Sequence, residues 1–112
     1  MSFLKNVTDK FNGLAICEQR AEEEDYNELI FFSKDLEQWY DIFVEFLGDP
    51  AKPAGVEPCD KDLVITDEYG GICGNQTLFY KEFDEGVVVV MLWPWQDKVH
   101  TTLKVIFLKK AE

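Results

Sequence analysis

One apolar run, Val87–Trp93, constrains the fold more than any other part of the sequence. Four consecutive valines lead into Met91, Leu92 and Trp93, so an extended chain here would be apolar on both of its faces. A strand with one wet face alternates apolar and polar residues, whereas an unbroken run is typical of a strand covered on both faces. We therefore expect an inner strand of a sheet, with apolar cover above and below it.

The segments that flank this run also have the character of strands. Residues 76–83 and 99–108 alternate apolar and polar side chains, and the short segments 84–86 and 96–98 are typical of tight turns. Residues 63–66 read Leu-Val-Ile-Thr, and their branched side chains predict one more strand. Short connections of this kind favour antiparallel neighbours.

Two segments have the periodicity of amphipathic helices. Residues 34–47 place apolar side chains at helical spacing, Ser33 can cap the first turn, and Gly48 stands where a helix commonly ends. Residues 2–12 predict a shorter helix that ends before Gly13 by the same reasoning.

Residues 14–32 leave two interpretations open. Residues 14–20 and 28–32 suit the two strands of a hairpin, with the acidic segment 21–27 as its turn. A helix that continues through 21–26 competes with this interpretation. The sequence does not decide between the two.

The expected order of elements is α-β-β-α-β-β-β-β, within one domain that spans residues 1–112. This order predicts a two-layer α+β fold, in which a mainly antiparallel sheet of about five or six strands carries two helices packed on one face. The other face then needs apolar cover from the N-terminal segment, a second copy or a bound partner. We favour a second copy, because monomers rarely expose large apolar patches, and a homodimer follows as a hypothesis.

Acidic side chains dominate the surface chemistry. The chain has 22 Asp and Glu residues against 11 Lys and Arg residues, which gives a formal net charge of −11. Such a surface repels phosphate backbones and anionic lipids, so we expect neither nucleic acid nor a membrane as a partner. The acidic segment 18–28 and the lysine-bearing segment 98–112 predict a contact between them, within one molecule or between two copies.

The cysteines indicate a compartment and argue against a metal. Cys17, Cys59 and Cys73 are odd in number and have no CxxC spacing. We expect free thiols in the cytoplasm, because a small secreted domain usually pairs its cysteines, and because residues 1–10 have no apolar stretch typical of a secretory signal. No residue spacing is typical of a zinc or calcium site, so we expect no metal and no cofactor.

No residue pattern is typical of a catalytic centre. Cys73 and His100, the sole histidine, are the thiol–imidazole pair that we considered, but nucleophilic catalysis also needs an orienting group and oxyanion donors. A structural cysteine is the interpretation we favour. The glycines of 70–74 lack the lysine and hydroxyl that follow in a phosphate-binding loop. We therefore do not expect an enzyme.

Aromatic side chains are the best candidates for a binding site. Trp93 and Trp95 flank Pro94 at the end of the expected inner strand, where rigid amphipathic rings can anchor a protein interface. Packing in the core is the competing role for both rings. We expect a non-enzymatic protein that acts through protein–protein contacts or self-association.

Two alternative functions remain open. The first is a small-molecule binder or enzyme with a pocket between the sheet and helix 34–47. The residues that would line this pocket are Trp39, Tyr80, Trp93 and Trp95. The second is an acidic mimic of nucleic acid, which would compete with DNA for a basic protein.

Overall fold

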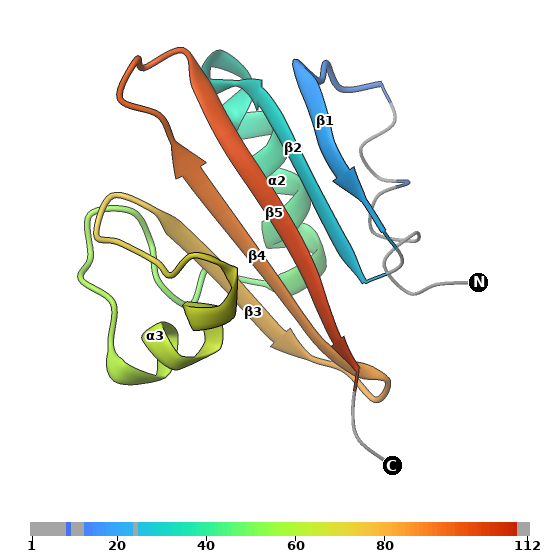
Figure 1. Ribbon diagram of the computed structural model, residues 1–112, viewed down its shortest axis with the longest axis vertical. Coiled ribbons are helices and arrows are strands. Elements are labelled where there is room, and N and C mark those ends of the chain that lie inside the picture. The colour runs from blue at the N-terminus through green and yellow to red at the C-terminus, as the bar shows by residue number, and fades with distance from the viewer. Residues whose placement is uncertain (1–8, 10–12, 24, 110–112) are drawn as a thin grey trace.

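A computed structural model of the protein describes residues 9, 13–23 and 25–109, and Figure 1 shows the sheet that organises them. Five strands lie in the order β1-β2-β5-β4-β3, and every neighbouring pair is antiparallel. The helices of the described part are α2 (Leu36–Leu47) and α3 (Asp60–Thr66). These elements confirm the predicted α+β class. The strands are β1 (Glu18–Glu22), β2 (Tyr26–Phe32), β3 (Thr77–Glu82), β4 (Gly86–Pro94) and β5 (His100–Lys109).

The apolar run becomes β4, an inner strand as predicted. β4 pairs with β3 on one side and with β5 on the other. Val88, Val90 and Leu92 are buried on the face that carries α2, whereas Val89 and Met91 are buried on the opposite face. The expectation of apolar cover on both faces is confirmed.

α2 covers the first of these faces. Trp39 and Phe43 lie at helical spacing and are fully buried against the sheet. Gly48 ends the helix with φ of 86°, as predicted, because this left-handed conformation favours glycine. Ser33 does not cap α2, because a 3₁₀ turn precedes the helix and the Ser33 hydroxyl instead shares a 2.7 Å hydrogen bond with Thr101.

Residues 63–66, which we expected to form a strand, lie in α3, and that prediction is wrong. α3 begins with a capping box, in which the Asp62 carboxylate accepts a 3.0 Å hydrogen bond from the backbone N–H of Cys59. The negative charge of Asp62 also suits the first turn of a helix. Leu63 and Val64 are exposed, so the side chains that favoured a strand pair with no neighbour across a sheet.

The segment from α3 to Ile72 covers the second face of the sheet. Ile65, Tyr69 and Ile72 pack with Met91 and Ile106 on the side opposite α2. The two helices of the described part therefore lie on opposite faces. The apolar face that suggested a homodimer is buried by the chain itself.

β1 and β2 form a hairpin, so the competing helix is excluded over the residues of these two strands. An irregularity in the pairing lies between Gln19 and Ala21. Glu28 of β2 lies directly opposite Lys104 of β5, so the acidic and lysine-bearing segments meet within one molecule. The helix predicted over residues 2–12 lies outside the described residues.

Candidate functional site

The four aromatic residues predicted to line one pocket do not share a surface. Trp39 is fully buried on α2, with its ring stacked 4.8 Å from the ring of Phe31. Tyr80 and Trp93 pack on the opposite face of the sheet, and Trp95 bonds to a residue of that same face. The structure therefore does not form a pocket between the sheet and α2 that all four residues line.

Trp93 packs against the segment from α3 to Ile72 that covers the second face of the sheet. Its indole ring lies against Gly70, where an added Cβ would come within 2.4 Å of a ring atom. The backbone of Gly70 also has φ of 99°, so both space and conformation require glycine there. Trp93 Nε1 is buried and has no hydrogen-bond partner within the described residues. The close contact with Gly70 indicates a packing role for this ring.

Trp95 is the most exposed of the four, with 39% of its surface accessible. Its Nε1 donates a 2.7 Å hydrogen bond to Oγ1 of Thr102, which fixes the indole at the end of β4. Its ring centre lies 4.9 Å from that of His100. Trp95 is thus the predicted binding residue best placed to meet a partner.

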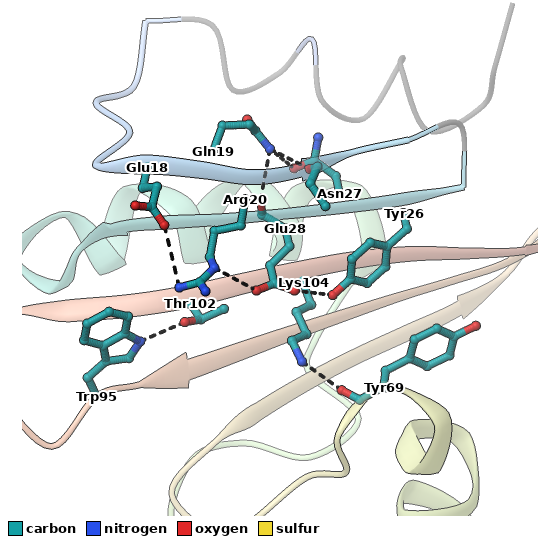
Figure 2. A network of polar contacts seen from close by, with 11 residues as sticks. Glu18, Gln19, Arg20, Tyr26, Asn27, Glu28, Tyr69, Trp95, Thr102 and Lys104 are labelled. Atoms are coloured by element: carbon teal, nitrogen blue, oxygen red, sulfur yellow. Dashed lines mark hydrogen bonds and ion pairs between the residues drawn. The ribbon is translucent and has the colours of Figure 1, made fainter.

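Other polar and aromatic side chains lie on the same face as Trp95 (Figure 2). They come from β1, β2 and β5 and from the 3₁₀ turn η3 (Asp67–Tyr69). In Figure 2, Trp95 stands at one end of the group and Tyr69 at the other. We call this group the β2–β5 face. Its members are Arg20, Tyr26, Glu28, Tyr69, Trp95, Thr102 and Lys104.

Glu28 lies at the centre of the β2–β5 face. The Tyr26 hydroxyl donates a hydrogen bond to one of its carboxylate oxygens, and Nε of Arg20 lies 3.6 Å from the other. Arg20 also lies 3.6 Å from Glu18. Burial raises the pKa of Tyr26 well above its usual value, and the hydrogen bond and charge of Glu28 raise it further. The phenol is therefore a stable donor to Glu28.

Lys104 joins the sheet to η3. Its Nζ donates a 2.9 Å hydrogen bond to the backbone carbonyl of Tyr69 and lies 3.6 Å from the centre of the Trp93 ring. Burial lowers the pKa of Lys104, while the charge of Glu28 acts in the opposite direction. The ring of Tyr69 also stacks on that of Tyr26, with 6.2 Å between centres.

The turn between β4 and β5 holds a pair of side chains that the sequence analysis missed. Nδ1 of His100 lies 2.6 Å from one carboxylate oxygen of Asp97, and the backbone N–H groups of Val99 and His100 donate to the other. These hydrogen bonds, above all the one to His100, lower the pKa of Asp97 to about 2. The Asp-x-x-His spacing across a predicted turn was the available signal.

His100 does not pair with the thiol considered from the sequence. Its Nδ1 is bonded to Asp97, whereas the backbone of Cys73 bonds to the side chain of Gln76 in a different turn. Cys73 is exposed and is a free cysteine. The hydrogen bonds of the described residues thus give no support to a Cys73–His100 nucleophile.

Lys52 is a buried cation whose contacts lie within its own loop and the turn before β3. Its Nζ donates to the backbone carbonyls of Pro53, Gly74 and Gln76, at 3.0 and 3.1 Å for the first two. All three ammonium protons therefore have acceptors. Burial lowers the pKa of Lys52, and the charge of Asp62 opposes this effect. Lys52 ties its own loop to the turn before β3.

Comparisons with known proteins give no matching family model, no matching curated protein and no matching solved structure. Among the residues that the structure describes, no three His, Cys, Asp or Glu side chains are grouped as metal ligands. Within the same ranges, no helix combines the length and the apolar character needed to cross a membrane.

Proposed function

We propose that the protein acts through protein–protein contact and that the β2–β5 face meets the partner. The exposure of two of its side chains carries the proposal, because Trp95 is 39% exposed and the Arg20 side chain 49% exposed. α2 packs on the opposite face, and α3 packs over residues of β3 and β4. Tryptophan, tyrosine and arginine are the residue types that contribute most to binding at protein interfaces.

The contacts within the face support the same proposal. Thr102 fixes the indole of Trp95, and Glu28 holds both the Tyr26 hydroxyl and the Arg20 guanidinium. Side chains that are ordered before binding lose less conformational entropy when a partner docks. The face is thus organised for binding without a large rearrangement.

Charge and cysteine chemistry support the class of partner and the location. The net charge of −11 opposes the approach of nucleic acid and of anionic lipid, so a protein is the partner that we propose. Three exposed free cysteines are typical of a reducing compartment, and we place the protein in the cytoplasm. The proposal involves no catalytic step and no cofactor.

Affinity capture from the cells that make the protein tests this function. Trp95→Ala and Arg20→Ala should each reduce the recovery of the captured partner, because each removes a large exposed side chain of the face. Val64→Ala is the matched control, because Val64 is 76% exposed on α3 and is not a member of the face. Circular dichroism of the purified variants should remain unchanged.

The same affinity capture would also detect a partner that is a second copy of the chain. In that case sedimentation should show a wild-type dimer that Trp95→Ala converts to a monomer. Equal recovery from wild type and both face variants would contradict the proposal. A loss that is as large for Val64→Ala would contradict it too.

A further inference from the structure

The second face of the sheet is covered by a segment that makes few contacts with the strands beneath it. This segment, residues 56–70, contains α3 and η3 and lies between Gly55 and Gly71. We infer that residues 56–70 form a lid, which opens as one unit about Gly55 and Gly71 and uncovers the apolar face of β4 and β5. Lys104 is the latch that keeps the lid closed. Opening of the lid is independent of the proposed docking of a partner.

Hydrogen bonding between the lid and the strands comes from one side chain. Among the described residues, the 2.9 Å bond from Nζ of Lys104 to the carbonyl of Tyr69 is the one hydrogen bond that joins the lid to a strand (Figure 2). The other hydrogen bonds of the lid are internal or reach Pro53 and Gly71 beside its two ends. Opening therefore breaks one hydrogen bond, whereas separation of β4 from β5 breaks a whole ladder.

The apolar packing of the lid is also thin. No apolar side chain of residues 56–70 belongs to the buried core, and Ile65 and Tyr69 are only partly buried against the sheet. Leu63 and Val64 are exposed. On the other face of the sheet, α2 buries three apolar side chains. A cover with so little buried apolar surface opens at a lower free energy than the strands beneath it separate.

Two further contacts of the lid are made by side chains at its margin. The ring of Tyr69 stacks on that of Tyr26, with 6.2 Å between centres, and Nζ of Lys61 lies 5.0 Å from the centre of the Tyr80 ring. None of these four residues is fully buried. Ring contacts at such positions are individually weak, so they do not fix the lid in place.

Lys104 is the latch because it contacts both the lid and the strand beneath it. Its Nζ bonds to Tyr69 of the lid and lies 3.6 Å from the centre of the Trp93 ring in β4. The closed lid also leaves Nε1 of Trp93 buried without a hydrogen-bond partner among the described residues. A buried donor without an acceptor disfavours the closed state, because water accepts its hydrogen bond once the lid opens.

The two ends of the lid are suited to act as hinges. Gly55 and Gly71 have φ of 90° and 80°, and an added Cβ would meet nothing within 4 Å at either residue. Glycine in open space changes its backbone angles at little cost. The chain below the hinges stays closed, because the backbone N–H of Gly55 donates a 2.7 Å hydrogen bond to Gly74. Nζ of Lys52 donates to the carbonyls of Gly74 and Gln76 at the same place.

Labelling of buried thiols tests the inference, in the whole chain with its three exposed cysteines replaced by serine. Met91→Cys places a thiol on the face beneath the lid. Val90→Cys is the matched control on the face beneath α2, and both side chains are 0% exposed in the wild type. Without denaturant, an aromatic disulfide reagent should label position 91 at least about tenfold faster than position 90, because only the lid has to open. Equal rates would overturn the inference.

Two further substitutions separate lid opening from unfolding of the whole chain. Phe43→Leu weakens the packing of α2, so it should speed the labelling of position 90 and leave position 91 unchanged. Lys104→Met removes the latch and should speed the labelling of position 91 by about fivefold. Faster labelling of position 91 in Phe43→Leu would overturn the inference, as would an unchanged rate in Lys104→Met.

A second pair of positions serves if circular dichroism shows that Met91→Cys or Val90→Cys does not fold. Ile106→Cys and Val105→Cys are neighbours on β5, with Ile106 on the face beneath the lid and Val105 on the face beneath α2. Both side chains are buried in the wild type. Position 106 should be labelled faster than position 105. Equal rates, or faster labelling of position 105, would overturn the inference.

Discussion

The ammonium group of Lys104 lies 3.6 Å from the centre of the Trp93 indole, and this contact ties an outer turn to an inner strand. The same group donates a 2.9 Å hydrogen bond to the carbonyl of Tyr69 in η3. One side chain of β5 therefore connects β4 with the segment that covers it. The apolar packing on the second face of the sheet and the polar β2–β5 face meet at this point.

Lys104→Met tests how much these contacts of Lys104 contribute to the free energy of unfolding. It should lower the free energy of unfolding by about 1–2 kcal/mol, because a cation–π contact and a hydrogen bond are lost while the apolar stem remains. Urea denaturation with an unchanged m-value measures the loss. Lys109→Met, an exposed position at the end of the same strand, should change the free energy by less than about 0.5 kcal/mol. Equal effects at both positions would contradict the assignment.

The raised pKa of Tyr26 predicts a specific alkaline behaviour. In the unfolded chain this phenol loses its proton near its ordinary pKa of 10.0, whereas in the folded protein it keeps it. Above that pH the folded state binds more protons, so the contribution of Tyr26 to stability falls as the pH rises.

Burial raises the pKa of Tyr69 as well, so ultraviolet titration of tyrosinate should show a late component from both residues among the four tyrosines, and Tyr26→Phe should reduce it. The lowered pKa values of Lys52 and Lys104 act on stability in the opposite direction and are common to both proteins. The difference between wild type and variant thus isolates Tyr26. An unchanged late component in Tyr26→Phe would exclude the proposed cause.

Lys52 should be far more important for stability than its sequence context suggests. Lys52→Met leaves the carbonyls of Pro53, Gly74 and Gln76 without their shared donor, and we expect a loss of about 3 kcal/mol. Thermal and urea unfolding both measure this loss. The exposed Lys61→Met is the control and should stay near the wild-type value. A loss at position 52 no larger than at position 61 would show that the three hydrogen bonds contribute little.

Two substitutions test the orientation of α3, the helix that forms where a strand was predicted. Val64→Asn should change stability by less than about 0.5 kcal/mol, because Val64 is 76% exposed, whereas Ile65→Asn should cost at least about 1 kcal/mol. The comparison depends only on which side chain packs against Ile72 and Met91. A larger loss at position 64 than at position 65 would contradict the orientation of α3.

The parts of the fold that the sequence predicted are those whose signal is local. The unbroken apolar run of β4 and the helical spacing of α2 are visible in consecutive residues, and both elements formed where expected. Residues 63–66 lacked such a signal. Their branched side chains favour a strand, but the capping by Asp62 and the packing of Ile65 onto the sheet outweighed that preference.

The candidate site was less predictable, because periodicity does not say which face of a sheet a side chain meets. Trp39 and Trp93 both have an apolar setting in the sequence, yet the sheet separates them. The contact between His100 and Asp97 depends on the exact path of one turn. The sequence offered Trp93 and Trp95 together as binding residues and did not indicate that Trp95 would be the more exposed of the two.

The most direct test of the central claim is site-specific photo-cross-linking in the cells that make the protein. A photoreactive benzoylphenylalanine placed at Trp95 should give a discrete adduct with a protein partner, because this side chain lies on the proposed docking face. The same residue placed at Val64 is the matched control, since that position is exposed on α3. The account predicts an adduct from position 95 and none from position 64. Adducts from position 64 alone would contradict it, as would a complete absence of adducts from position 95.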